Sequence, residues 1–392
     1  MTNLVQVHNA PHRSALQAVR SNLNAQLLER EEVITGSLVA LLAREHCLIL
    51  GPPGTAKSLL TEETSMSVEL AEYFRVLMSK FTVPEQIEGG LSLLGLQKDE
   101  YRRNTKGFLP EAHFAFLDEI YKANSAIINS LLSAMEERIY MQNGVKTKMP
   151  LVTLFGASNE FPEDSSLEAV HDRFMLRYWV PYLKERKNRK RLITDDLPQS
   201  NGASMTLTEL ELCQQEVASV VLPDAIAETC LDIWQRMEDE GIIASDRRWR
   251  KAVSKILRAY AYLEGCDEVD EDHLDILNAC MWRELKQRDT LSGIIAAQAN
   301  PLTTQVERVL SLVQDSMDEL GPLPPKFDED GRTLWQGRAA TASSHIKKSL
   351  REIDELQSKY ANRKQTKANA VKAQLVQMHK DISRQHAETF TL

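Results

Sequence analysis

The hydrophobic pattern in the first half of the chain alternates between helical periodicity and short apolar runs. Apolar residues recur every three or four positions over 12–45, which predicts helix. The run from His46 to Leu50 that follows predicts a buried strand. The same two patterns predict further strands at 74–78, 114–118, 151–157 and 175–180 and helices from 58 to about 70 and over 124–137. Strands that alternate with helices predict an α/β fold with a mostly parallel sheet.

Two segments interrupt this alternation. Residues 84–107 contain several glycines and have no clear period. Asn143-Gly144 stands between β-prone flanks, which predicts a tight hairpin. We expect both segments to project from the sheet domain as loops.

The second half of the chain has an almost wholly helical pattern. Turn-forming residues at 194–204 and a Pro- and Gly-rich stretch at 321–331 break it. Beyond Gly337 apolar residues recur at coiled-coil spacing in two segments: Ile346, Leu350 and Ile353, then Val371, Leu375, Met378 and Ile382. An antiparallel pair of helices is the first interpretation, and one long helix is the alternative. The breaks predict an α/β domain over 1–193, a helical domain over 205–298 and a helical extension over 299–392.

Composition narrows the class of protein. The chain has 392 residues, of which 43% are hydrophobic and 26% charged, as in globular proteins. No apolar run reaches 18 residues and no secretory signal is recognised, so we expect neither a membrane span nor export. Five scattered cysteines without a C-x-x-C pair favour free thiols in the cytoplasm. The net charge of −9 weighs against nucleic acid as the main partner, although the tail beyond 337 is basic.

A phosphate-binding motif follows the first predicted strand. Residues 51–58 read G-P-P-G-T-A-K-S, close to the pattern G-x-x-x-x-G-K-[ST], in which backbone N–H groups surround a phosphate at a helix N-terminus. Lys57 would reach the β- and γ-phosphates, and the hydroxyl of Ser58 would bind Mg²⁺. The residues expected to touch the nucleotide here are Gly51, Pro52, Pro53, Gly54, Thr55, Ala56, Lys57, Ser58 and Leu59.

Ala56 departs from the general pattern, which has glycine at this position. Alanine is tolerated where φ is negative, so we expect Ala56 to have negative φ in the first turn of the helix. A positive φ would be unfavourable by roughly 1 kcal/mol and would favour a scaffold that binds nucleotide without hydrolysing it.

Polar residues follow two more of the predicted strands. Asp118 ends the strand 114–118, and Glu119 comes next. Asp118 would orient Mg²⁺, and Glu119 would polarise the water that attacks the γ-phosphate. Asn159 follows the strand 151–157, where its amide could bind that water or the γ-phosphate.

Seven stretches in the same order together resemble the MoxR group of AAA+ ATPases and, within it, the RavA branch. They are 51–58, F-T-V-P-E (81–85), G-F-L-P-E-A-H-F-A-F-L-D-E-I (107–120), I-N-S-L-L-S-A-M-E-E-R (128–138), A-S-N-E-F-P (157–162), S-S-L-E-A-V-H-D-R-F (165–174) and S-D-R-R-W (245–249). The similarity covers roughly residues 15–295. MoxR-like sequences also carry alanine at the position of Ala56.

The resemblance implies a nucleotide domain, a helical lid and a six-membered ring. It makes Arg173 an arginine finger that acts on ATP in the neighbouring subunit, and Asn159 the sensor 1 residue. Arg247 would be sensor 2, a lid arginine that touches phosphate in its own subunit, with the adjacent Arg248 and Arg250 as alternatives. Val33 and Ile34 match the segment that covers adenine.

The implied activity is Mg²⁺-dependent ATP hydrolysis by a hexamer that remodels a protein client beside a protein with a von Willebrand factor A domain. The two interrupting segments match insertions that line the pore or face a substrate in related rings, with plain surface loops as the alternative. We see no match to the small β-rich module of RavA in 300–392, so its partner is not expected here. A motor dependent on DNA or RNA is the alternative function, while GTP use is disfavoured because no N-K-x-D signature occurs.

Overall fold

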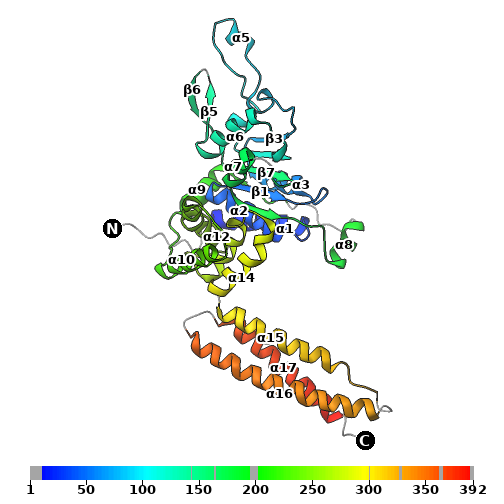
Figure 1. Ribbon diagram of the computed structural model, residues 1–392. Helices are drawn as coiled ribbons and strands as arrows, with labels where there is room; N and C mark the ends of the chain where they lie inside the picture. The colour runs from blue at the N-terminus through cyan, green and yellow to red at the C-terminus, as the bar shows by residue number, and fades with distance from the viewer. Residues whose placement is uncertain are drawn as a thin grey trace. The chain divides into compact units, whose positions relative to one another are not determined.

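The computed structural model describes residues 11–142, 144–162, 165–194, 202–299, 301–325, 329–361 and 365–388. The chain divides into two compact units, Met1–Ser292 and Gly293–Leu392. Figure 1 shows both units, and each is described here by itself.

A five-stranded parallel sheet forms the centre of the first unit, which confirms the predicted α/β fold. Its strand order is β3-β4-β7-β1-β8, and every neighbouring pair is parallel. The strands are β1 (His46–Leu50), β3 (Tyr73–Leu77), β4 (Phe114–Asp118), β7 (Thr153–Ser158) and β8 (Phe174–Trp179). Every residue of β1 and β7 is buried, as expected for central strands of a sheet covered on both faces.

Five helices of the first unit belong to the sheet domain: α1 (Pro11–Gln26), α2 (Glu31–Ala43), α3 (Lys57–Met66), α6 (Ser125–Glu136) and α7 (Ser165–Arg173). Residues 12–45 are helical as predicted, but they form two helices, α1 and α2. The chain turns between α1 and α2, where Glu29 has a left-handed φ of 56°. Helical periodicity continues through this turn because Leu27 and Val33 are buried on either side of it.

Both interrupting segments project from the sheet domain, as expected (Figure 1). Residues 84–107 carry only two short helices, α4 (Glu85–Glu88) and α5 (Leu93–Leu96), and α5 lies at the end of an arm that extends away from the sheet (Figure 1). The arm exposes Leu93 and Leu94 by 76% and 71%. The predicted hairpin is confirmed: β5 (Ile139–Gln142) pairs antiparallel with β6 (Val145–Lys148), although Asn143 lies outside the described residues.

The rest of the first unit is mostly helical and is anchored to the sheet domain. Its helices are α8 (Arg186–Ile193), α9 (Leu207–Val217), α10 (Asp224–Asp239), α11 (Asp246–Lys251), α12 (Leu257–Leu263), α13 (Leu277–Cys280) and α14 (Arg288–Ala299), the last of which crosses the boundary between units. A π-helical turn (Ala252–Ile256) joins α11 to α12. Lys251 and Lys255 form ion pairs of 2.8 and 2.7 Å with the buried carboxylate of Glu45, next to β1.

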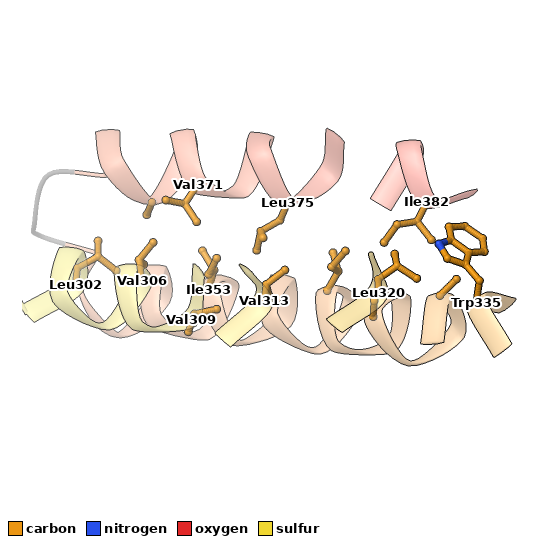
Figure 2. Packing of buried hydrophobic residues seen from close by; sticks show 14 residues of the cluster. Leu302, Val306, Val309, Val313, Leu320, Trp335, Ile353, Val371, Leu375 and Ile382 are labelled. Atoms are coloured by element: carbon orange, nitrogen blue, oxygen red, sulfur yellow. The ribbon is translucent and has the colours of Figure 1, made fainter. Parts of the chain in front are cut away.

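The second unit packs three helices around one apolar core (Figure 2). They are α15 (Pro301–Leu320), α16 (Glu329–Lys359) and α17 (Thr366–Glu388). Val306, Val309 and Val313 of α15 lie in the same core as residues of α16 and α17, so the predicted pair of helices gains a third member. The alternative of one long helix was wrong, because α16 ends at Lys359. No helix within the described ranges is both long and apolar enough to cross a membrane.

Candidate functional site

The carboxyl ends of three neighbouring strands bring the predicted polar residues to one edge of the sheet. Asp118 ends β4, Asn159 follows β7, and Gly51 follows β1, which lies beside β7. The N–H of Gly51 donates to the carbonyl of Ser158 at 3.1 Å and fixes the start of the loop. Open parallel sheets bind ligands in the crevice beyond the carboxyl ends of their strands.

The loop 51–56 joins β1 directly to α3, as predicted for a phosphate-binding loop. Gly51 has a φ of 151°, and a β-carbon there would lie only 2.2 Å from the carbonyl oxygen of Val180. A side chain therefore cannot be accommodated at Gly51. Gly54 has a φ of 75°, which glycine adopts at little cost. Helix α3 begins at Lys57, so its unpaired N–H groups face the curl of the loop, where an anion is favoured.

The prediction for Ala56 was wrong. Its φ is 65° and its ψ is 25°, which is the left-handed region, and it stands immediately before α3 rather than in the first turn. The loop must reverse here so that the helix can begin at Lys57, and this reversal explains why the general pattern places glycine at the position. The carbonyl of Ala56 accepts from the N–H of Leu60 at 3.0 Å, so the strained residue still caps the helix. Taken by itself, the strained backbone of Ala56 favours the alternative function, a scaffold that binds nucleotide without hydrolysing it.

Arg30 holds the phosphate loop in place through hydrogen bonds, a role that the sequence did not predict. Its guanidinium is buried and donates to the carbonyls of Glu29, Thr55 and Pro181 at 2.6, 3.3 and 2.9 Å. Burial lowers the pKa of Arg30, against the opposing effect of Glu29. Thr55 is held further by a 2.9 Å bond from its hydroxyl to the carbonyl of Pro52. An arginine in a turn has no signal in the sequence, because its acceptors come from three separate segments.

The side chain of Lys57 bends back toward the start of the phosphate loop. Its Nζ donates to the carbonyls of Gly51 and Pro52 at 2.7 and 2.9 Å. Partial burial lowers the pKa of Lys57, while Asp118 and Glu119 act in the opposite direction. The ammonium thus lies at the mouth of the loop with two acceptors that phosphate oxygens could replace.

Ser58 and Asp118 meet across the crevice, as the sequence predicted for a shared metal ion. The hydroxyl of Ser58 donates to Oδ2 of Asp118 at 3.3 Å. Both offer hard oxygen donors, which suit Mg²⁺. No group of three or more His, Cys, Asp or Glu side chains that could together hold a metal ion occurs among the described residues. A pair of donors fits Mg²⁺, which typically keeps waters and binds substrate phosphates rather than filling a protein cage.

Glu119 lies beside this pair in an unusual backbone conformation. Its φ is 52°, its N–H donates to Oδ1 of Asp118 at 3.1 Å, and its carboxylate forms a 3.4 Å ion pair with Lys122. The conformation turns the chain from β4 into the 3-10 turn Ile120–Lys122. Asn159 is exposed at the end of the neighbouring strand. The phosphate loop, Ser58, Asp118, Glu119 and Asn159 therefore lie together at this edge of the sheet.

Arg173 lies at the opposite edge. It ends α7 immediately before Phe174, the first residue of β8, and its Nη1 donates to the carbonyl of Ala169 at 2.9 Å. It lines a cavity of about 360 Å³ together with Ser245 and Arg283. A strand of six residues separates this edge from the phosphate loop by roughly 20 Å. Arg173 therefore does not reach the loop of its own chain.

Arg247 does not lie near the phosphate loop of its own chain either. This corrects the expectation that it touches phosphate in its own subunit. Its Nη1 forms a 2.6 Å ion pair with Glu136 at the end of α6. The preceding residue, Met135, bonds to His46, the first residue of β1, at 2.8 Å. Arg247 thus lies at the amino edge of the sheet, on the side of Arg173.

Arg248, one of the two alternatives for this role, is structural. It is buried and donates to the carbonyls of Asp172, Phe174, Met175 and Cys280 at 2.6 to 3.1 Å. Arg250 is exposed. Val33 and Ile34 are 5% and 0% exposed in α2, so they belong to the core rather than to an adenine contact.

Comparison with protein families gives two matches. Residues 14–214 match the model for the MoxR domain in the MoxR–vWA–β-propeller ternary systems. Residues 225–295 match an AAA lid domain.

Individual proteins are similar over much of the chain. An uncharacterised protein of Methanocaldococcus jannaschii is 36% identical over 306 residues, which are 78% of this chain and 80% of the relative. The chaperone MoxR1 of Mycobacterium tuberculosis is 28% identical over 54% of this chain and 59% of its own. The crystal structure of a protein proposed to be an ATPase, from Cytophaga hutchinsonii, shares the fold with a TM-score of 0.59 at 16% identity, over 73% of this chain and 94% of that one.

Proposed function

We propose, from the premise that this chain belongs to the MoxR family of AAA+ ATPases, that it hydrolyses ATP with Mg²⁺ to remodel a protein client. The observation that carries the proposal is the convergence of Lys57, Ser58 and Asp118 at the carboxyl edge of the sheet, with Glu119 next to them. We assign 1–193 to nucleotide binding, 205–298 to the lid and 299–392 to a helical extension.

Each residue at this edge has a separate task in the proposed reaction. The N–H groups of the loop and of α3 hold the phosphates, and Lys57 exchanges its loop carbonyls for phosphate oxygens. Ser58 and Asp118 would hold Mg²⁺, which neutralises phosphate charge when bound. Glu119 orients the attacking water and accepts its proton, and Asn159 fixes that water from the next strand.

A ring of identical subunits, which we propose to be a hexamer, completes the site. Charge that develops on the γ-phosphate during hydrolysis requires a nearby cation such as an arginine finger. Arg173 lies at the far edge of its own sheet, so it serves the phosphate loop of the neighbouring subunit. Arg247 lies on the same side and is assigned to the same neighbour.

We propose that the arm carrying α5 and the β5–β6 hairpin contact the client, because their tips expose apolar residues such as Leu93 and Met141. A von Willebrand factor A domain protein is the proposed partner, in line with the systems for which the matching family model is named. The seven motif stretches support a RavA-like branch, and five cysteines that form no disulfide suit the cytoplasm.

Three substitutions test the proposal. Lys57→Ala is expected to abolish ATP binding, and Glu119→Gln to bind ATP but hydrolyse it slowly, by at least a hundredfold. Arg173→Ala is expected to retain ATP binding and to lose turnover. A small amount of this variant mixed with the unaltered chain is expected to inhibit the whole ring.

Normal ATP binding by the Lys57 variant would refute the assignment of residues 51–58 as a phosphate-binding loop.

The same assay separates the alternatives. Binding without turnover in the unaltered chain would establish the scaffold, which the strain at Ala56 favours. A large rise in turnover on adding DNA or RNA would establish a nucleic-acid motor instead of a protein remodeller.

A further inference from the structure

Helix α8 (Arg186–Ile193) is a basic helix without a buried residue. Arg186, Lys187 and Lys190 are exposed, and Lys190 lies four positions after Arg186 and three after Lys187, so it shares a face with each of them. Ile193 continues that face and is 84% exposed. We call these four residues the basic stripe.

The basic stripe is tied to the phosphate loop. The carboxylate of Glu29 accepts from the N–H groups of Lys184 and Glu185 at 2.7 and 3.0 Å and from Nδ2 of Asn188 at 3.1 Å. The next residue, Arg30, donates to Thr55 within the loop. Helix α8 is therefore held in place at the nucleotide-binding edge of the first unit.

Helix α10 (Asp224–Asp239) carries the opposite charge. Asp224, Glu228 and Asp232 recur every four residues and are exposed, and Leu231 between them is 54% exposed. We call these four residues the acidic stripe. The chain that follows α10 contributes Ile243, Ala244 and Ser245 to the cavity lined by Arg173. The carboxyl end of α10, the helix that carries the acidic stripe, is therefore connected to the Arg173 side of the unit.

The two stripes do not neutralise each other within one chain. Figure 1 shows α8 and α10 on opposite sides of the first unit. No ion pair joins a charged residue of either stripe to another residue in the described part of the chain. Each stripe combines like charges with one exposed aliphatic side chain, so the two surfaces are complementary in charge and in apolar contact.

We infer that the basic stripe of one copy docks on the acidic stripe of a second copy. Because the stripes lie on different sides of the unit, the contact is head-to-tail and repeats from copy to copy, as in a ring. The same contact turns the Arg173 side of one copy toward the phosphate loop of the next. The inference thus rests on the proposed function and names the surface that aligns its subunits.

Charge reversal tests the contact. We expect Lys187→Glu with Lys190→Glu to raise by about tenfold the protein concentration at which assembly is half complete, because two attractive pairs become repulsive. Glu228→Lys with Asp232→Lys is expected to have the same effect. A chain that carries all four substitutions regains attraction and is expected to assemble as the unaltered chain does. Sedimentation velocity of the full chain with a non-hydrolysable ATP analogue measures each state.

The matched control is Lys347→Glu with Lys348→Glu on α16, in the second unit, which makes the same change in charge and is expected to leave assembly unchanged. The inference is overturned when the fourfold variant assembles as poorly as either double variant, when the reversals have no effect, or when the unaltered chain stays monomeric. Binding of single-stranded DNA or RNA that requires Lys187 and Lys190, with assembly unaffected, would also overturn it. Failure of the unaltered chain to bind ATP would instead refute the proposed function, and the two failures are thereby distinguished.

Discussion

Ala56 holds a left-handed backbone conformation that costs an ordinary residue roughly 1 kcal/mol. The surrounding bonds maintain it: Leu60 donates to its carbonyl, and Arg30 holds the carbonyl of Thr55 before it. A strained residue at the entry to α3 keeps the loop curled before any ligand arrives.

Glycine at this position is expected to relieve the strain. We expect Ala56→Gly to raise the free energy of unfolding by about 0.5 kcal/mol, since relief of about 1 kcal/mol is partly offset by the greater freedom of glycine in the unfolded chain. Ala56→Val is expected to lower both stability and ATP affinity, because a β-branched residue is least tolerated at positive φ. Urea unfolding and ATP titration measure the two effects. Destabilisation of the glycine variant would show that Ala56 is not strained.

The sequence predicted the residues at the carboxyl edge of the sheet, but it did not predict the buried arginines that support the surrounding structure. Lys57, Ser58 and Asp118 could be predicted because a motif fixes their spacing and strand ends fix their place. Arg30 and Arg248 could not, because each is defined by carbonyls that tertiary folding brings together. The φ of Ala56 was mispredicted because helix propensity was applied to a residue that precedes the helix.

At the scale of elements, a buried hydrogen bond connects the two edges of the sheet domain. Tyr121 lies in the turn that follows Glu119, and its hydroxyl is 2.5 Å from Nδ1 of His171 in α7. Burial, reinforced by Arg177 and Arg248, lowers the pKa of His171 to about 2, so the hydroxyl of Tyr121 shares this hydrogen bond with a neutral ring. Arg173 follows two residues later in the same helix.

Tyr121→Phe is expected to lower turnover more than ATP affinity. The variant loses one buried hydrogen bond, worth about 1 kcal/mol, and releases the helix that positions Arg173. Tyr140→Phe in the β5–β6 hairpin is the matched control, since its hydroxyl donates to Gln142 two residues away in the same strand. Steady-state kinetics and thermal unfolding of both variants separate positioning from stability. If the Tyr121 variant is destabilised but its turnover is unchanged, the hydrogen bond stabilises the fold and does not position Arg173.

The boundaries of helices and strands could be predicted where residues of the turn itself interrupt the pattern. They could not be predicted where tertiary packing sets the boundary. The β5–β6 hairpin could be predicted from Asn143-Gly144 because the turn itself selects those residues. The break at Glu29 could not, because the residues around it remain apolar and buried. The third helix of the second unit, α15, lies within the predicted extension 299–392, but the coiled-coil spacing was recognised only beyond Gly337 and so predicted two helices.

At the scale of the whole first unit, Glu45 joins the lid to the sheet domain. Its side chain is only 2% exposed and is held by Lys251 and Lys255. Burial raises the pKa of Glu45, but the two ammonium groups outweigh burial and leave the pKa below its ordinary value. The ion pairs therefore stabilise the fold at neutral pH, and their contribution falls as pH drops below about 4.5 and through the folded-state pKa.

Glu45→Gln is expected to destabilise the first unit by about 2 kcal/mol at pH 7. This is less than the full cost of breaking a buried pair, because the two lysines are 23% and 45% exposed and can turn to water. The difference from the unaltered chain is expected to shrink at acid pH, where Glu45 itself becomes protonated. Denaturant unfolding at pH 7, 5 and 3.5 checks this sign, and a difference that grows toward acid pH would contradict it.

The position of β1 in the sheet has a consequence for how the chain folds. Its partners are β7 and β8, which lie more than about 100 residues later, as in the pairing of Cys47 with Phe155. During synthesis, the strand that presents the phosphate loop emerges early and stays unpaired until first β7 and then β8 have left the ribosome. Such distant parallel pairing is slow and leaves apolar strands open to aggregation. The three-helix unit, whose core joins successive helices, has no such delay, and we expect it to refold first after denaturation.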